Sequence, residues 1–532
     1  MNRAHRRRGA ANYFYLSVTV SLAVLAGLLF FLFRGTPRGP GLSGGRLFVF
    51  CAAGLRVPVE KIAAQYEREY GVAIQLQYGG SATLLSQLEV GNTGDLYLAG
   101  DDSYTRLAHE KGLVEEQIPV AWMRPVLAVK KGNPKKIRGL DDLVRDDVRV
   151  ALGNPDQSAI GQTARRLLSD SGHWAAIEEH TGEGGVFKPT VPEVANDVKL
   201  GSVDAGIVWD ATVAQYPDLE AIRVPELDRG TAQITVGVTS RAKNPTTALQ
   251  FARYLAARDR GLEVFRQEGY EPVDGDRWVE VPELTFFAGS VNRRALGPVI
   301  ERFQQREGVV VNTVYNGCGI LTAQMRSIEK NQQSGFPDVY MACDVYYLDT
   351  VREMFQEAAD VSNTDIVIVV QKGNPKEIHG LKDLLQPGVR VAVGQPDQCT
   401  IGVLTKRLLE KEGIYEELLN NNVVTQTATS ALLVPNVTTA SADAVLAYAT
   451  DTLAEGEKLD VIPIDSPLAK AIQPFSVARS SDFKYLGRRL FETVAASRGD
   501  FEAAGFRWGL GDKGLSPLED EPDAGGGPDG EE

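Results

Sequence analysis

The chain has 532 residues, which is enough for roughly three or four domains of ordinary size. Its composition, 43% hydrophobic and 24% charged residues, is typical of a globular protein. Asp and Glu (70) outnumber Lys and Arg (56), so the net charge is −14 and argues against binding to nucleic acid. Four cysteines and five histidines exclude a small disulfide-stapled fold and a histidine-rich metal enzyme.

The N-terminal region has the pattern of a membrane anchor. Residues 1–12 include four arginines, and residues 13–33 are 21 uncharged, mostly apolar residues, which as a helix span the roughly 30 Å core of a bilayer. Because arginines stay on the cytoplasmic side, we expect a single-pass anchor with a cytoplasmic N-terminus and the rest of the chain exported. A cleaved signal peptide is the alternative, but no clear cleavage site follows. Residues 34–45 read as a flexible tether.

The body of the chain contains the same unit twice. The sequence KGNP at 131–134 recurs at 372–375, and the PDQ and Ile-Gly that follow it recur with the same offset of 241. A period of this length is too long for a solenoid repeat. It predicts two homologous domains, which we place at 46–276 and 282–510.

The first copy begins with a strand, a helix and a second strand. Residues 47–50 are a short apolar run, and apolar residues over 59–70 recur at helical spacing. Gly71 stands where a helix would end, and residues 72–76 alternate as a strand does.

The second copy repeats this order. A strand is expected at 284–287, then a helix that begins at Pro298 and ends at Gly308, then a strand at 309–311. Alternating strands and helices predict α/β architecture with mainly parallel sheets, in which ligands bind beyond the carboxyl ends of the strands.

The C-terminal residues 511–532 are acidic and rich in Gly and Pro, which predicts a disordered tail.

Small-residue turns precede predicted helices three times in each copy. They lie at 51–54, 79–81 and 154–158 in the first copy, and at 288–290, 316–319 and 395–399 in the second. Such turns let backbone N–H groups approach an anion, although most are plain connections between a strand and a helix. No Walker A sequence occurs, so they are not nucleotide-binding loops.

The order of these motifs resembles one family. The segments FCAAG, YGGSATL, DLYLAGD, LGNPDQSAIG and DAGIVWDA are similar to those of the molybdate-type periplasmic solute-binding proteins, and the resemblance covers both copies. It implies two tandem, two-lobed periplasmic-binding domains of class II, which follow the transmembrane helix predicted from the apolar run. It also implies an oxyanion ligand and the permease of an ABC transporter as partner.

The resemblance carries ligand-binding positions onto this sequence. In the family, two Ser hydroxyls, backbone amides and a Tyr hydroxyl hold the oxyanion between the lobes. The matching positions are Gly54, Ser81, Ile160, Val191 and Trp209 in the first copy, and Ser290, Cys318, Ile401, Ser430 and Tyr448 in the second. Neither copy has the full set. Judged from the residues alone, Ser81 and Ser290 also suit helix N-caps, and Trp209 and Tyr448 also suit a core.

Three of the four cysteines belong to the second copy. Cys318, Cys343 and Cys399 lie in loops that we expect to face the cleft between the lobes. Together they would suit a soft metal or a thiophilic ligand. They are equally compatible with one disulfide in an exported protein, or with small apolar packing.

The sequence therefore predicts a membrane-anchored, extracytoplasmic solute-binding protein that captures molybdate or tungstate for an ABC importer. A sensor or scaffold ectodomain that has kept the binding fold is the alternative, as is binding of a soft metal or thiophilic ligand by the second copy. No enzymatic activity is expected, because neither a GxSxG elbow nor a Ser/His or Cys/His set can be argued from the spacing. No cofactor is expected.

Overall fold

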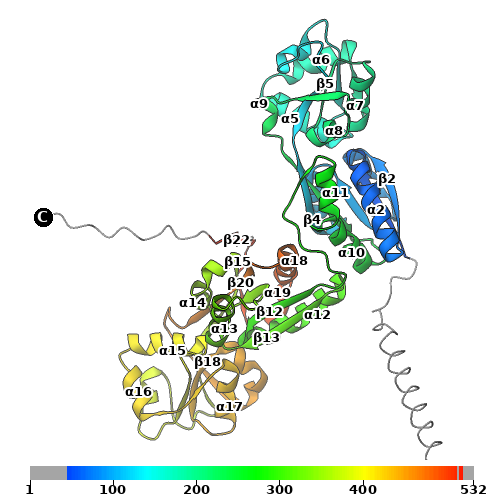
Figure 1. Cartoon of the computed structure of the whole chain (residues 1–532). Coiled ribbons are helices and arrows are strands. Elements are labelled where there is room, and N and C mark those ends of the chain that lie inside the picture. Colours follow the sequence, from blue (N-terminus) through cyan, green and yellow to red (C-terminus); the bar gives the residue numbers. More distant parts are fainter. Residues whose placement is uncertain (1–44, 512–513, 519–532) are drawn as a thin grey trace, which may run out of the picture.

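The computed structural model describes residues 45–511 and 514–518, which form two domains in succession (Figure 1). We refer to residues 46–276 as domain one and to 282–510 as domain two. The predicted anchor at 13–33 lies outside the described residues. Within the part that is described, no helix has the length and apolarity needed to cross a bilayer.

Domain one consists of two lobes, each built on its own sheet. The sheet of lobe A has the strand order β11–β4–β10–β3–β1–β2. Its strands are β1 (Arg46–Ala52), β2 (Ala73–Gly79), β3 (Leu96–Ala99), β4 (Val114–Met123), β10 (Ala232–Thr239) and β11 (Glu271–Pro272). Its helices are η1 (Ala53–Leu55), α2 (Arg56–Tyr70), α3 (Ser81–Val90), α4 (Asp102–Glu110), α10 (Pro245–Leu255) and α11 (Gly261–Gln267).

Lobe B of domain one has the strand order β7–β6–β8–β5–β9. Its strands are β5 (Pro125–Lys130), β6 (Val150–Gly153), β7 (Val186–Lys188), β8 (Ala205–Trp209) and β9 (Leu219–Ile222). Its helices are η2 (Leu140–Val144), α5 (Ala159–Asp170), α6 (Trp174–Gly184), α7 (Val191–Leu200), α8 (Asp210–Ala214) and α9 (Pro225–Asp228). The chain crosses between the lobes twice, from β4 to β5 and from α9 to β10.

Domain two repeats these lobes, but its two sheets are joined. The strands are β12 (Glu283–Gly289), β13 (Val310–Asn316), β14 (Val339–Met341), β15 (Phe355–Gln371), β16 (Val391–Gly394), β17 (Val423–Thr427), β18 (Ala444–Tyr448), β19 (Leu459–Pro463), β20 (Lys470–Ala478), β21 (Arg507–Trp508) and β22 (Ser516–Pro517). The 17-residue strand β15 pairs with β20 in lobe A and with β18 in lobe B. Domain one divides the same path into β4 and β5 at Pro125, a residue that has no N–H for the ladder.

The helices of domain two follow the same pattern as those of domain one. They are η3 (Ser290–Asn292), α12 (Arg293–Glu307), α13 (Cys318–Lys330), α14 (Val345–Asp349), η4 (Arg352–Met354), η5 (Leu381–Leu385), α15 (Thr400–Lys411), α16 (Tyr415–Asn421), η6 (Ser430–Leu432), α17 (Leu433–Thr438), η7 (Ala449–Lys458), α18 (Lys484–Ala495) and α19 (Arg498–Ala503).

The residues at the first strand and helix of each copy explain why these elements form. Strand β1 is buried over 49–52, since it lies between β2 and β3 and is covered by helices. Helix α2 ends at Gly71, which adopts a φ of +70° and donates its N–H to the carbonyl of Glu67. Gly308 ends α12 in the same way, with a φ of +67°.

Two sequence-based expectations are corrected. Pro298 does not begin a helix; it lies inside α12, which starts at Arg293. Its missing N–H leaves the carbonyl of Arg294 without a helical partner, and Arg294 is exposed to solvent.

The tail predicted to be disordered contains an ordered piece, because β22 pairs with β15. Residues 519–532 lie outside the described residues.

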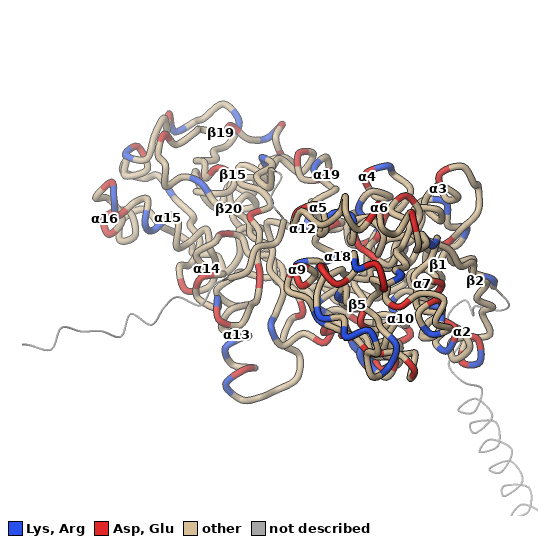
Figure 2. Tube along the Cα trace, turned by 90° about the horizontal axis from the view of Figure 1, so that it is seen from above, with Lys and Arg blue, Asp and Glu red and all other residues tan. Residues whose placement is uncertain are grey.

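The two domains contact each other through their A lobes. Glu307 of α12 lies 2.8 Å from Arg253 of α10 and 2.6 Å from Arg489 of α18, and all three side chains are buried. Burial by itself would raise the pKa of Glu307, but the two guanidinium groups outweigh it and lower the pKa. Asp276 accepts two backbone hydrogen bonds at the start of α18, from the N–H of Tyr485 and of the next residue, each at 2.9 Å. Elsewhere, acidic and basic segments are interspersed over both domains (Figure 2).

Candidate ligand-binding site

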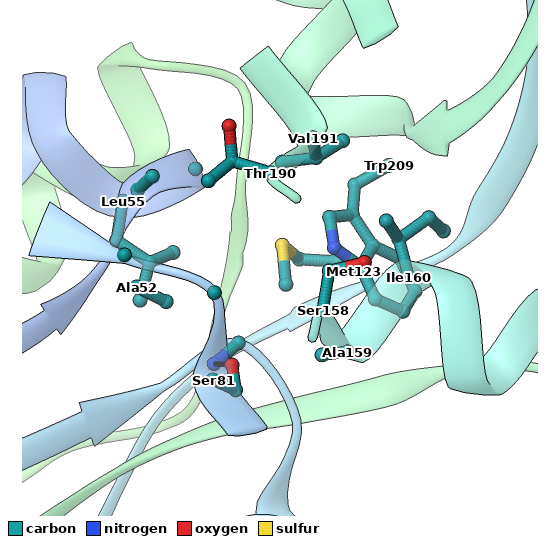
Figure 3. Close-up of a pocket in the computed structure, with 15 residues that line it drawn as sticks. Ala52, Leu55, Ser81, Met123, Ser158, Ala159, Ile160, Thr190, Val191 and Trp209 are labelled. Carbon is teal, nitrogen blue, oxygen red and sulfur yellow. Dashed lines mark hydrogen bonds between the residues drawn. The ribbon is translucent and has the colours of Figure 1, made fainter. Parts of the chain in front are cut away.

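A cavity of about 340 Å³, its open mouth included, lies between the lobes of domain one (Figure 3). All five positions carried over from the family resemblance line it: Gly54, Ser81, Ile160, Val191 and Trp209. They come from five separate elements of both lobes. None of the described residues that line the cavity carries a charge, so a ligand there is held by dipoles and hydrogen bonds.

Ser81 is the first residue of α3 and is buried. It is not an N-cap: Gly80 occupies that position, and the Ser81 hydroxyl instead accepts a hydrogen bond from the N–H of Gly100 at 3.1 Å. The carbonyl of Ser81 accepts a bond from the Tyr97 hydroxyl at 2.8 Å. Since the hydroxyl oxygen is already an acceptor, its proton is free to be donated to a ligand.

Two helices of lobe B point their N-termini at the cavity. Within the described residues, the N–H groups of Ala159 and Ile160, in the first turn of α5, and of Val191, the first residue of α7, have no acceptor. Ser158 caps α5 by accepting a bond from Gly161 at 3.2 Å. Unpaired N–H groups at helix N-termini are well suited to an anion.

Trp209 forms the inner wall of the cavity together with Met123 (Figure 3). The indole ring is 2% exposed and stands at the end of β8. Its N–H has no partner among the described residues, and it can donate one hydrogen bond. Trp209 therefore has both of the roles considered from the sequence: its side chain is buried in the core, and it also lines the cavity.

The lobes of domain one are closed on each other. The N–H of Ala82 in lobe A donates to the carbonyl of Gln157 in lobe B at 3.2 Å. A Cβ atom placed on Gly80 would lie 2.1 Å from that same carbonyl oxygen and 2.7 Å from the carbonyl oxygen of Pro189. Only glycine fits at position 80 when the lobes meet.

Gly54 shows why the first Ser of the family is missing from this copy. A Cβ atom at Gly54 would lie 2.8 Å from Cγ1 of Val191 across the cleft, so a serine there needs Val191 to move. The carbonyl of Gly54 accepts a hydrogen bond from the Tyr270 hydroxyl at 2.7 Å, which fixes the turn. Domain one thus offers one serine hydroxyl where the family pattern has two.

Sequence reasoning missed several lining residues. Met123, Ala159 and Thr190 all line the cavity. Ala159 and Thr190 adjoin predicted positions and could have been found from the same loops. Met123 is the last residue of β4 and lies more than 40 residues after Ser81, the predicted position that precedes it in the sequence. No local pattern in the sequence marks it as a lining residue.

In domain two the carried-over positions stand at equivalent places. Ser290 begins η3, Cys318 begins α13, Ile401 is the second residue of α15, Ser430 begins η6 and Tyr448 ends β18. Tyr448 pairs with Ile366 as Trp209 pairs with Pro125. The lobes are closed here too, since the hydroxyl of Tyr347 in lobe A donates to the carbonyl of Pro396 in lobe B at 3.0 Å.

The polar groups of domain two differ from those of domain one. The hydroxyl of Tyr448 is buried and has no hydrogen-bond partner within the described part of the chain. Burial, reinforced by the nearby thiols and by Asp344, raises its pKa well above the ordinary value. Burial also raises the pKa of Asp451, just beyond β18, to about 6, although the charge of Arg294 acts against it. Domain two therefore holds a tyrosine hydroxyl where domain one has an indole.

The three cysteines of domain two do not form a common site, which corrects the predicted thiol-metal centre. Cys318 and Cys343 lie with their sulfur atoms 3.1 Å apart. Cys399 points elsewhere, toward the carbonyl groups of Gln395 and Thr427 at 3.6 and 3.5 Å. Among the residues that the structure describes, no group of three or more His, Cys, Asp or Glu side chains could hold a metal ion, and all four cysteines are free thiols.

Comparison with known proteins agrees with this geometry. The family described as bacterial extracellular solute-binding protein matches residues 47–271 and again 284–507. The chain belongs to this family. It contains the solute-binding domain twice.

Each relative matches a stretch of this chain about as long as one solute-binding domain, and that stretch covers most of the relative's own length. A binding protein of Haemophilus influenzae is 29% identical over 232 residues, which are 42% of this chain and 91% of the relative. The molybdate-binding protein ModA of Mycobacterium bovis is 27% identical over 239 residues, 44% of this chain and 88% of the relative. Among solved structures, the periplasmic molybdate-binding protein of Azotobacter vinelandii is 16% identical, with a TM-score of 0.36 over 42% of this chain and 98% of its own.

Proposed function

We propose that this solute-binding protein captures a small oxyanion, molybdate or tungstate, between the lobes of domain one and delivers it to an ABC importer. The observation that carries the proposal is the uncharged cavity into which the Ser81 hydroxyl and the unpaired N–H groups of Ala159, Ile160 and Val191 converge. A cation is disfavoured because no carboxylate is found among the described residues that line the cavity. An oxyanion accepts hydrogen bonds from every one of these groups.

The relatives support the same ligand class. The ModA proteins of Mycobacterium bovis and Escherichia coli are named as molybdate-binding proteins, and this chain covers 88% and 89% of their lengths. The permease of an importer is then the partner. In this proposal residues 13–33 anchor the chain in the cytoplasmic membrane, and both domains lie on its outer face.

Calorimetric titration of the purified full chain tests the ligand. Sodium molybdate and sodium tungstate should each release or absorb heat with a saturating curve, and the fluorescence of Trp209 should change as the anion fills the cavity beside the indole. Chloride at the same ionic strength is the control for a salt effect. Absence of saturable binding of either oxyanion would contradict the proposal.

The exposed Ser202 offers a matched control variant within domain one. Its hydroxyl donates only to the carbonyl of Asp197, at 3.1 Å, outside the cavity. Ser202→Ala should therefore bind as the unaltered chain does. If Ser202→Ala and Ser81→Ala weakened binding equally, the cavity would not be the binding site.

A further inference from the structure

Two cysteines form a buried pair in the cleft of domain two. The sulfur atoms of Cys318, at the start of α13, and Cys343, just after β14, are 3.1 Å apart, and both side chains are buried. The N–H of Cys343 donates to the Cys318 sulfur at 3.1 Å. The pair joins the N-terminus of a helix to the carboxyl end of a neighbouring strand, which is the edge where the cleft lies.

Domain one has the same arrangement with an oxygen in place of the sulfur. There the N–H of Gly100 donates to the Ser81 hydroxyl, also at 3.1 Å. The strand registers match these positions, because Leu98 pairs with Cys51 as Met341 pairs with Ala288. Domain two has thus exchanged a serine for one thiol and a glycine for a second thiol at adjoining positions.

A third exchange makes room for the second thiol. A Cβ atom at Gly100 of domain one would lie 3.7 Å from the Cβ of Ala52, so a longer side chain there would meet that methyl group. In domain two the position of Ala52 is taken by Gly289. A Cβ atom on Gly289 would lie only 2.2 Å from the sulfur of Cys343. The glycine and the two cysteines therefore fit together as a set.

We propose that Cys318 and Cys343 are a reversible disulfide site in the cleft of domain two. A low-molecular-weight disulfide, RSSR, is the oxidant. The Cys318 sulfur attacks it and releases RSH, and the Cys343 sulfur then displaces the second RSH. The two thiols lose two electrons and two protons, and both protons leave on the two RSH molecules. The inference goes beyond the proposed function and holds whether or not the protein binds an oxyanion.

The surroundings of the pair indicate the order of the two steps. Burial opposes ionisation of both thiols, but at Cys318 it is outweighed by the Cys343 thiol, the Thr400 hydroxyl and the Cys343 N–H, which together lower the pKa of that thiol. The same hydrogen bond raises the pKa of Cys343. Cys318 is therefore the attacking thiol. A disulfide needs its sulfur atoms about 2.05 Å apart, so the bond draws this pair together by about 1 Å.

Oxidation changes what the cleft offers to a ligand. The reduced Cys318 carries a thiol proton at the position where Ser81 carries its hydroxyl proton, and the disulfide has none. Because both sulfur atoms are buried between closed lobes, the oxidant reaches them only when domain two opens. Tyr347→Phe removes the hydroxyl that bridges the lobes to Pro396, so it should increase the oxidation rate several-fold.

The test uses the full chain, reduced and then incubated with oxidised glutathione. Free thiols are counted under denaturing conditions, and linked peptides are identified by mass spectrometry. The chain has four cysteines, and two thiols should be lost, with the Cys318 peptide linked to the Cys343 peptide. Dithiothreitol should restore all four.

Three variants serve as controls. Cys318→Ser reproduces the serine of domain one, and Cys343→Gly reproduces its glycine; neither should lose a thiol pair. Cys399→Ser removes the thiol outside the pair and should still lose two. Absence of the linked peptide from the unaltered chain, or a disulfide that involves Cys51 or Cys399, would overturn the proposal.

Discussion

At the scale of single residues, Ser81 combines a structural and a binding role. Its hydroxyl accepts the Gly100 N–H and has one proton left for a ligand. Ser81→Ala should weaken oxyanion binding by about 1–3 kcal/mol, measured by calorimetry. It should also lower the stability of domain one by about 1–3 kcal/mol, because the buried N–H of Gly100 loses its acceptor.

Ser81→Cys separates the two roles, since domain two shows that a thiol can accept the same N–H. This variant should restore most of the melting temperature lost in Ser81→Ala while binding the oxyanion weakly. If Ser81→Cys bound as tightly as the unaltered chain, the hydroxyl proton would have no part in binding.

Asp451 gives domain two a stability that depends on pH. Burial raises its pKa from 3.8 to about 6 in the folded protein, so the folded state holds the proton more tightly than the unfolded state. The resulting stability is fully present below about pH 4 and is lost as the pH rises through 6, by about 3 kcal/mol in total. Asp451→Asn should therefore raise the melting temperature of domain two strongly at pH 7.5 and much less at pH 4.5. An equal change at both values would contradict the assignment.

Individual residues also show which parts of the site could be predicted from the sequence. Ser81 lies in a small-residue turn that is readable as a pattern, whereas Ile160 and Val191 were found only through the family resemblance. The sequence did not reveal that Ser81 accepts a bond from Gly100, because that contact joins a helix start to the end of a different strand. For the same reason the loops placed three thiols near the cleft, yet only two meet: the side chain of Cys399 turns to the carbonyl of Thr427.

At the scale of elements, the N-terminus of α3 determines how closely the lobes approach. Gly80 has a φ of −70°, which alanine adopts without strain, so Gly80→Ala leaves the open domain intact. In the closed domain its methyl group would meet the carbonyl oxygen atoms of Gln157 and Pro189. The variant should stay open and lose oxyanion binding by at least tenfold, with an increased radius of gyration in X-ray scattering when ligand is present.

Gly182→Ala is the control for this variant, because a Cβ atom at that position of α6 meets nothing within 4 Å. It should close and bind normally. A Gly80→Ala chain that closed on ligand as the control does would show that the lobes meet differently from the structure.

Strand and helix types were readable from the sequence, whereas their joints were not. Alternating apolar patterns predicted the first strand and helix of each copy, and Gly71 and Gly308 marked the helix ends. The rule that proline begins helices failed at Pro298, since the turn at Ser290–Asn292 had already started the helix. Pro125 marks the break of the crossover strand in domain one, but no local pattern shows that β15 continues from its pairing with β20 into its pairing with β18.

At the scale of the whole molecule, a buried ion triad connects the domains. Glu307 of domain two lies between Arg253 of domain one and Arg489. Glu307→Gln leaves two buried guanidinium groups without a counter-charge, so stability should fall by about 3–5 kcal/mol, measured by thermal unfolding. Glu301→Gln, on the exposed face of the same helix, should change it little. Equal melting temperatures for the two variants would contradict a role for the triad.

The central claim is that domain one encloses an oxyanion, and anomalous diffraction from crystals of the full chain grown with sodium tungstate tests it most directly. The account predicts a tungsten peak inside the cavity, within hydrogen-bonding reach of the Ser81 hydroxyl and the N–H groups of Ile160 and Val191, beside the ring of Trp209. An empty cavity, with tungsten only on the outer surface, would contradict it.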